Sequence, residues 1–300
     1  MSHEHHHPHT GDGRVIGAII ANLVLTLGQV LGGILSGSLV LIADALHNFS
    51  DMASMVIALV ARRIARRPAD PAMTFGYRRI ETVAALVNYT SLILIGLYLA
   101  FEGGMRLLDP PEVGGGTVIA LGVLALVVDT LTAILTGSIR QGGANIRALF
   151  LHNLSDALTS VAVVVSGVLI VLYGWRLIDP LITLLIAGYI LWLSATEVGG
   201  VIRVLMLGSP PEIDTEAVLD CIRGLAGVED IHHAHFWLME ESSAALDTHV
   251  VVANDAWPEQ QVIKARIRKE LASRFGIHHA TLELEPSSEQ HEGASLYGRG

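Results

Sequence analysis

Two short segments of this 300-residue chain repeat the same pair of potential metal ligands. Residues 46–51 read LHNFSD and residues 151–156 read LHNLSD, so each segment places a histidine four positions before an aspartate. Because four positions make about one helical turn, the two side chains of each pair lie on one face of a helix. The candidate ligands are His47, Asp51, His152 and Asp156. Two imidazoles and two carboxylates match a tetrahedral Zn²⁺ site, although Co²⁺, Ni²⁺ and Fe²⁺ also accept these donors.

Both pairs lie in or beside strongly apolar stretches, where charged side chains are unfavourable. The chain is 51% hydrophobic and 16% charged, and its mean hydropathy is +0.52. An aspartate near the middle of a bilayer costs about 2.5–3.5 kcal/mol, so it normally faces the bundle interior at a pathway or site. A single His-x-x-x-Asp pair is more often hydrogen-bonded or solvated than bound to metal. Its repetition in two separate apolar stretches favours a metal site, provided that the two helices face each other.

The charges of such a site suggest a mechanism. Zn²⁺ held by two aspartates and two neutral histidines is electrically neutral overall. Its departure would leave two negative charges in a medium of low dielectric constant, which is unfavourable unless protons replace the metal. Histidine, with a reference pKa of about 6.5, readily takes a proton at cellular pH, and ligands bind metal only when deprotonated. A site that opens alternately to each side of a membrane would therefore exchange metal for protons.

Six apolar stretches are long enough to cross a bilayer, which takes about 20 residues. We expect membrane helices at residues 14–36, 39–63, 79–102, 115–139, 148–173 and 177–204. Arginines gather in the second-to-third and fourth-to-fifth connections, and short arginine-rich loops stay in the cytoplasm. The sequence therefore predicts an integral protein of the cell (inner) membrane with both termini in the cytoplasm.

The composition changes near residue 208. Residues 1–208 carry 13 acidic and 12 basic side chains, whereas residues 209–300 carry 16 acidic and 7 basic ones. The junction LGSPPEID has the Gly, Ser and Pro of a linker, and the single cysteine excludes an intramolecular disulfide. We expect a histidine-rich cytoplasmic tail at 1–13, a transmembrane domain at 14–206, a cytoplasmic metal-binding domain at 207–286 and a flexible tail at 287–300.

The cytoplasmic domain combines helical and strand patterns. Helical patterns cover residues 214–227, with Asp214 as the expected N-cap, and 258–275. Alternating apolar patterns predict strands at 233–240, 245–253 and 279–286. The order αββαβ predicts a small α+β domain of ferredoxin-like or metallochaperone-like type. The expected fold class is thus an α-helical membrane protein with six transmembrane helices followed by this domain.

Three segments resemble the signatures of the cation diffusion facilitator family: LIADALHNFSD (41–51), FGYRRIE (75–81) and LHNLSD (151–156). The resemblance extends over residues 14–286 and includes the layout of six spans and a small cytoplasmic domain. It implies a homodimeric antiporter that moves divalent metal out of the cytoplasm in exchange for protons. In that family the positions of the two His/Asp pairs form the transport site, and histidine at position 47 is associated with zinc preference. Cd²⁺, Co²⁺, Ni²⁺ and Fe²⁺ are further candidate substrates.

The resemblance also concerns the cytoplasmic domain, in which six histidines lie at strand starts or along strands. Family members bind regulatory metal at positions like His232, His249, His279 and Glu285, and His232 and His235 recur in a stretch similar to IHHAHFW (231–237). The candidate cytoplasmic ligands are therefore His232, His235, His249, His279 and Glu285. Metal there would counter the mutual repulsion of two acidic domains.

The loop after the second span departs from the family pattern. Some members hold a second metal in this loop with aspartate and histidines. Here the loop contains Asp70 but no histidine, and Tyr77 stands near a position where those members have one. We expect no metal site in this loop.

Two further aspartates lie in the predicted spans. Asp44, one turn before His47, either orients the His47 ring as a hydrogen-bond acceptor or packs helices. Asp129, in the middle of the fourth span, either belongs to a proton route or bonds a neighbouring helix.

Other functions fit the sequence less well. An intramembrane zinc metalloenzyme would keep three protein ligands, a water and a general base, whereas four ligands close the coordination shell here. A membrane metal sensor would use the soluble domain as its output, but no kinase, nuclease or DNA-binding signature is present. The sequence also has no strong cluster of basic residues of the kind that binds nucleic acid. We therefore expect a transporter, not an enzyme, whose partners are protons, membrane lipid and a second copy of the chain.

Overall fold

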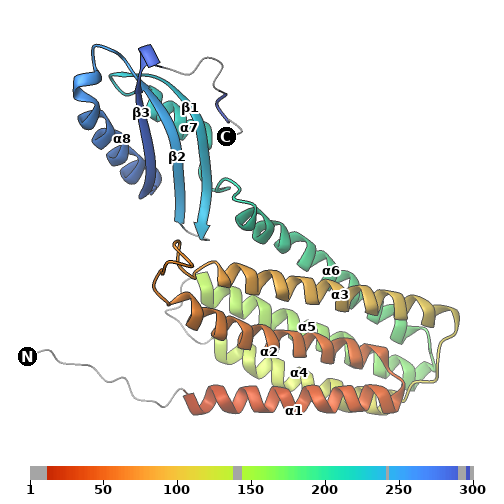
Figure 1. Cartoon of the computed structure of the whole chain (residues 1–300). Coiled ribbons are helices and arrows are strands. Elements are labelled where there is room, and N and C mark those ends of the chain that lie inside the picture. Colours follow the sequence, from red (N-terminus) through yellow and green to blue (C-terminus); the bar gives the residue numbers. More distant parts are fainter. Residues whose placement is uncertain (1–11, 138–143, 241–242, 290–294, 298–300) are drawn as a thin grey trace, which may run out of the picture. The chain divides into compact units, whose positions relative to one another are not determined.

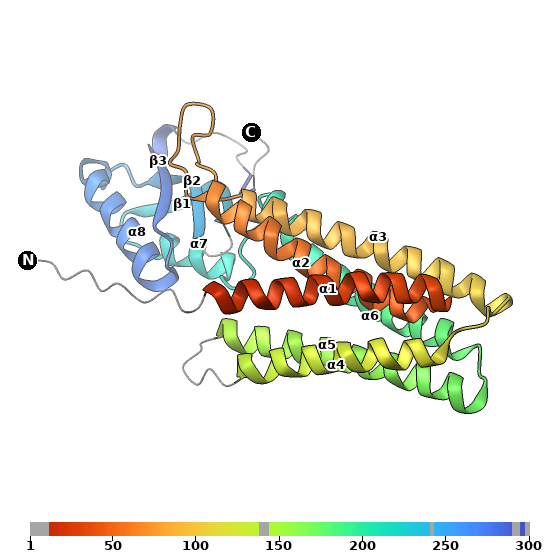
Figure 2. The same cartoon turned by 90° about the horizontal axis from the view of Figure 1, so that it is seen from below.

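The computed structural model describes residues 12–137, 144–240, 243–289 and 295–297, with the side chains of 12–21, 133, 135–153 and 240 left undescribed. The first six helices are α1 (Asp12–Ser36), α2 (Leu39–Ala65), α3 (Ile80–Leu108), α4 (Gly115–Gly137), α5 (Ala144–Tyr173) and α6 (Ile178–Leu205). They run side by side in both ribbon views (Figure 1 and Figure 2). By contacts the chain forms two compact units, residues 1–60 with 87–197, and residues 61–86 with 198–300.

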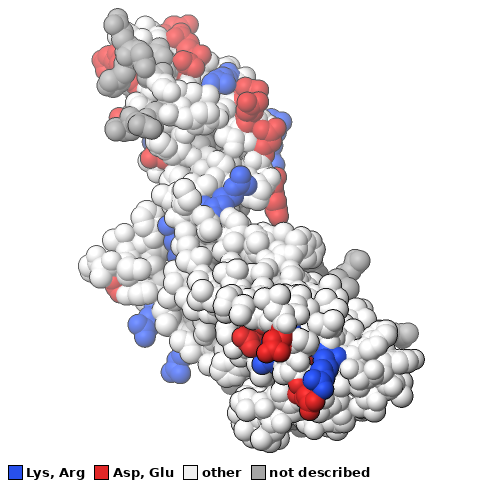
Figure 3. Space-filling view, turned by 90° about the vertical axis from the view of Figure 1, so that its right-hand side faces the viewer, with Lys and Arg blue, Asp and Glu red and all other residues white. Residues whose placement is uncertain are grey.

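Five of the described helices, α2 to α6, are long and apolar enough to cross a membrane, and α1 adds the shorter apolar stretch Asn22–Ser36. At most 44% of any spanning window is buried inside the protein, so most of the apolar surface faces outward. Figure 3 shows wide surfaces without Lys, Arg, Asp or Glu. A bilayer solvates such surfaces, and helices satisfy their own backbone hydrogen bonds within it. The predicted helical membrane domain is confirmed.

Helix α3 is longer than the sequence predicts, because it continues past position 102 to Leu108. Arg106 Nε lies 2.9 Å from Oε1 of Glu102, one helical turn away. The two charges thus stabilise each other on the helix, and Glu102 does not end it.

The α1–α2 connection is a tight turn held by residues from distant helices. Gly37 adopts a φ of 72°, a conformation that glycine adopts without a Cβ clash. The fully buried Asp179 of α6 accepts hydrogen bonds from Ser38 Oγ at 2.6 Å and from the backbone N–H of Leu39 at 2.8 Å. Arg106 Nη1 donates to the Gly37 carbonyl at 2.7 Å. Asp179 therefore caps the N-terminus of α2, the helix that carries His47 and Asp51.

The C-terminal domain has the predicted order αββαβ. Its elements are α7 (Thr215–Arg223), β1 (Val228–Glu240), β2 (Ser243–Val252), the short 3-10 helix η1 (Trp257–Glu259), α8 (Gln260–Phe275), β3 (His279–Pro286) and the 3-10 helix η2 (Ser287–Glu289). In the sheet, β1 pairs antiparallel with β2, and β2 pairs parallel with β3. The predicted α+β domain is confirmed.

Both helices of this domain pack on the sheet through one apolar face. The buried residues Val218, Leu219 and Ile222 of α7 and Ile263, Ile267 and Leu271 of α8 share a core with the strands. As predicted, Asp214 caps α7, since its carboxylate accepts the N–H groups of Glu216 and Ala217. The helix ends earlier than predicted, at Arg223, with Gly224 as its C-cap.

Replacing Asp179 by alanine removes the cap of α2 and leaves buried donors without an acceptor. We expect Asp179→Ala to lower stability by about 0.5–2 kcal/mol, the usual effect of losing an N-cap. Thermal unfolding of the detergent-solubilised protein, followed by tryptophan fluorescence, measures this change. Asp109→Ala, at an exposed carboxylate of the α3–α4 connection, is the matched control and should leave Tm unchanged. Equal Tm values for the two variants would contradict the capping role.

Candidate metal centres

Three of the four predicted membrane ligands lie together between α2 and α5. His47 Nε2 is 3.2 Å from Oδ1 of Asp156 and 3.7 Å from Oδ2 of Asp51. One donor atom from each residue lies within 4.8 Å of the others, although His47 and Asp156 are 109 positions apart in sequence. The fourth, His152, lies on α5 four residues before Asp156, but its side chain falls outside the described residues. The described cluster therefore contains one imidazole and two carboxylates.

The membrane cluster is shielded from solvent by the helices. His47 is only 7% exposed, and its Nδ1 atom is buried without a hydrogen-bond partner among the described residues. Two carboxylates around one imidazole, in an apolar bundle, strongly favour a cation. Nitrogen and oxygen donors at these separations fit a divalent transition metal, or protons on the same atoms.

Asp44 on α2 and Asp129 on α4 are also buried, but they have neutral donors as partners. Asp44, 1% exposed, accepts a hydrogen bond from the side-chain amide of Gln29 on α1. Asp129 on α4 accepts from Ser160 Oγ of α5 at 2.6 Å. Both contacts join neighbouring helices, as a packing role requires. A part in proton transfer stays a prediction for both residues.

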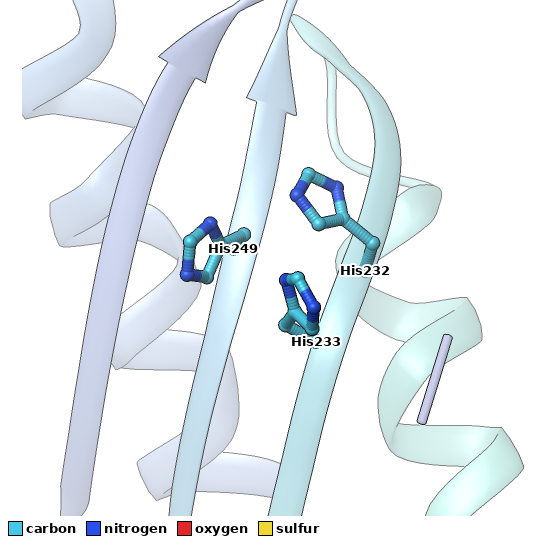
Figure 4. A group of neighbouring side chains, drawn as sticks. All are labelled: His232, His233 and His249. Atoms are coloured by element: carbon cyan, nitrogen blue, oxygen red, sulfur yellow. The ribbon is translucent and has the colours of Figure 1, made fainter. Parts of the chain in front are cut away.

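A second cluster lies on the sheet of the C-terminal domain and contains His232, His233 and His249 (Figure 4). The three ring centroids are 5.0–5.3 Å apart. His232 and His249 face each other across β1 and β2, where they are register partners. At least one donor nitrogen from each ring lies within 4.8 Å of the others, so the three rings can share one ion.

Glu285 of β3 completes this cluster. Its Oε1 atom lies 2.9 Å from both His232 Nε2 and His249 Nδ1, and Glu283 Oε2 is 3.4 Å from His249 Nε2. Burial lowers the pKa of His232 below its usual value, against the opposing effect of the Glu285 carboxylate. The lowered pKa favours the neutral ring, which is the form that binds metal.

His233 was not among the predicted ligands. Regular alternation along a strand would place His232 and His233 on opposite faces. However, the β1 register shifts between His232 and His235, and His233 takes a left-handed φ of 49°. This bulge turns both adjacent histidines toward His249. The adjacent histidines were a visible signal, but nothing in the sequence indicates the bulge.

Two predicted cytoplasmic ligands lie away from this cluster. His235 is exposed and pairs in register with Asp247, two residues from His249 along β2. His279 is exposed at the start of β3, six residues before Glu285, which is about 20 Å along an extended strand. Neither residue belongs to the cluster of His232, His233 and His249, and their metal ligation remains a prediction.

In the α2–α3 loop, Asp70 is engaged by the loop itself. Its Oδ2 atom accepts the hydroxyl hydrogen of Tyr77 at 2.6 Å, and Oδ1 accepts the N–H groups of Ala72 and Met73 at 2.8 and 2.9 Å. These hydrogen bonds, that of Tyr77 foremost, lower the pKa of Asp70. The expectation of no metal in this loop stays a prediction, and the geometry gives Asp70 a structural role.

The chain is similar to known membrane proteins along its whole length. The sequence profile of the cation efflux transmembrane domain matches residues 15–206, and that of the cytoplasmic domain of cation efflux proteins matches residues 210–287. The cadmium, cobalt and zinc/H(+)-K(+) antiporter of Bacillus subtilis is 33% identical over 303 residues, which cover 99% of this chain and 96% of the relative.

Two further relatives cover nearly as much. The metal cation efflux system protein CzcD of Cupriavidus metallidurans is 31% identical over 94% of this chain and 89% of the relative. The zinc transporter ZitB of Escherichia coli is 30% identical over 98% of each chain. Among solved structures, the metal-bound C-terminal domain of CzcD from C. metallidurans is 32% identical and covers 24% of this chain and 99% of that one, with a TM-score of 0.23.

The geometry of the sheet cluster predicts which histidines bind metal in the C-terminal domain. In an Asp51→Asn background, which weakens the membrane cluster, we expect His249→Ala to weaken zinc binding at least as much as losing an outer-shell partner does, roughly 10–100-fold. His235→Ala is the matched control and should bind like its parent, because His235 lies outside the cluster. Isothermal titration of the full-length protein with Zn²⁺ measures both. An equal loss in the two variants would refute the ligand set read from the structure.

Proposed function

This chain belongs to the cation efflux, or cation diffusion facilitator, family of membrane transporters, and we propose that it exports Zn²⁺ from the cytoplasm in exchange for protons. The observation that carries the proposal is the buried contact of His47 with Asp51 and Asp156. Relatives named as metal antiporters and zinc transporters, alignable over nearly the whole chain, support it.

The proposed transport site consists of His47, Asp51, His152 and Asp156. The two carboxylates supply the negative charge that draws a divalent ion into an apolar bundle, and the two imidazoles complete a tetrahedral set. When the site opens outward, protonation of the ligands lowers the affinity for metal and releases it. The protons that replace the metal keep the buried carboxylates neutralised during the return. In this cycle the buried carboxylates carry either the metal or the protons at every stage.

Zinc is the proposed main substrate, with Cd²⁺ and Co²⁺ as accompanying ones. Mixed imidazole and carboxylate donors suit zinc, and geometry and availability, not raw affinity, usually decide selectivity among such metals. The name of the Bacillus subtilis relative contains cadmium, cobalt and zinc. The same name includes K⁺ beside H⁺. H⁺ and K⁺ therefore have to be tested separately as counter-ions.

We further propose a homodimer in the cell membrane with both termini in the cytoplasm. The arginine-rich connections after α2 and α4 support this orientation. Residues 209–300 carry nine more acidic than basic side chains, so two such domains repel each other. Metal bound by His232, His249 and Glu285 would reduce that repulsion, which makes cytoplasmic metal a plausible activator of export.

Removing one carboxylate from the transport site should abolish zinc flux. We expect Asp51→Asn and Asp156→Asn, reconstituted in proteoliposomes, to reduce zinc transport by more than the roughly 10–100-fold typical of outer-shell losses. A zinc-sensitive dye inside the vesicles measures the initial rate. Glu197→Gln, at an exposed carboxylate of α6, is the matched control and should transport normally. Wild-type rates in either aspartate variant would refute the proposed site.

Proton coupling predicts that a pH gradient alone drives zinc movement. Vesicles with an acidic interior should accumulate zinc against its gradient, because exiting protons free the ligands for metal. A protonophore should stop this accumulation, whereas replacing K⁺ by choline should leave it unchanged. Accumulation that persists with the protonophore but disappears in choline would instead identify K⁺ as the counter-ion.

A further inference from the structure

A hollow lies at the ends of α2 and α3 and the loop that joins them, within residues 61–86. Its volume is about 800 Å³, and four arginines line it. They are Arg62, Arg66, Arg67 and Arg78, and among the described residues of the lining only Glu81 is acidic. We call this the arginine hollow. Its lining has an excess of positive charge although the whole chain has a net charge of −10.

The loop that bounds the arginine hollow is folded by its own hydrogen bonds. Asp70 binds the Tyr77 hydroxyl and two backbone N–H groups of the loop, as described above. The Arg67 guanidinium lies 5.9 Å from the centroid of the Tyr77 ring, within the range of a cation–π contact. Because these contacts fix the loop, the wall of the hollow is formed without a ligand.

We propose that the arginine hollow binds the phosphate headgroup of an anionic lipid of the cytoplasmic leaflet. Guanidinium groups present paired N–H donors that match phosphate oxygens, and four arginines line this hollow. Basic pockets beside the cytoplasmic ends of membrane helices are the usual sites for such headgroups. Thr82, in the first turn of α3, also lines the hollow, and a helix N-terminus favours an anion. The carboxylate of Glu81 in the same turn opposes an anion, but the four arginines outnumber it.

Two exposed apolar side chains of the same loop indicate a lipid and not a free anion. Phe75, which lines the hollow, is 74% exposed, and Met73 is 45% exposed. The loop joins two candidate membrane spans, Leu39–Ala65 and Ile80–Leu108, so it lies at the level of the membrane surface. There an exposed phenylalanine can contact acyl chains while the arginines hold the headgroup.

Membrane topology alone does not account for the hollow. Arginines after α2 retain the loop in the cytoplasm wherever their side chains point. Arg63 contributes equally to that rule but does not line the hollow. Arg79 is also directed elsewhere, since its guanidinium donates to the carbonyl groups of Met239 and Leu238 at 3.1 and 3.2 Å. The two kinds of arginine provide a matched comparison.

The test compares Arg66→Gln with Arg63→Gln, which remove the same charge from the same helix end. Full-length protein in detergent is titrated with dioleoylphosphatidylglycerol, and native mass spectrometry gives the Kd of the first bound lipid. We expect Arg66→Gln to weaken binding about fivefold and Arg62→Gln/Arg66→Gln roughly 25-fold, since each basic residue contributes separately. Arg63→Gln should change the Kd less than twofold. Arg66→Lys, which keeps the charge, should recover part of the loss.

Three results would overturn the proposal. The first is an equal effect of Arg63→Gln and Arg66→Gln on the Kd, which would show that the arginines attract the lipid only through their overall positive charge. The second is equal binding of dioleoylphosphatidylcholine, which would show that the site does not distinguish an anionic headgroup from a zwitterionic one. The third is displacement of the lipid by millimolar inorganic phosphate, which would identify a free-anion site. Zinc flux of each variant is measured separately in proteoliposomes, so a loss of transport is distinguished from a loss of lipid binding.

Discussion

The central constraint on this protein is the presence of carboxylates inside an apolar helix bundle. Asp51 and Asp156 both approach the Nε2 atom of His47, where the protein and the bilayer offer little solvation. Two negative charges in such a place require compensation at every stage of the cycle. A divalent ion and protons can both provide it, and they compete for the same atoms. In the proposed cycle, the exchange of one for the other would therefore follow from electrostatics, without a separate coupling device.

Other buried acids of the bundle show how this site differs from structural ones. Asp44, Asp129 and Asp179 each accept hydrogen bonds from neutral donors on another segment. Such acids hold α1, α4 and α6 to the helices that carry the candidate ligands, and at least one oxygen of each acid already accepts a hydrogen bond. At His47 the carboxylates face an imidazole instead, with one ring nitrogen still without a described partner. The chemical partner of each buried acid, more than its burial, therefore distinguishes the structural acids from those of the candidate site.

The cytoplasmic domain applies the same principle at a surface. Helices α7 and α8 cover one face of the sheet with an apolar core, and the histidine cluster lies on the strands. Glu285 hydrogen-bonds the His249 ring and lies 2.9 Å from His232 Nε2, so these donor atoms already lie close together. The left-handed backbone at His233 is a strained feature at this cluster, and strain of this kind persists where the surrounding structure enforces it. Imidazole rings held in place beside a carboxylate would suit the proposed binding of regulatory metal.

The sequence by itself determined the helical membrane domain, the order αββαβ and the four candidate ligands of the membrane site. Hydropathy, alternation and i, i+4 spacing are local properties, so they can be read from the sequence without knowing how the elements pack. Only the tertiary structure decided that α2 and α5 bring His47 to Asp156, because that contact joins residues 109 positions apart. It also decided that His233, and not His235 or His279, stands beside His232 and His249. A bulge in β1 and the pairing of three strands produce that arrangement, and neither leaves a signal in the residues themselves.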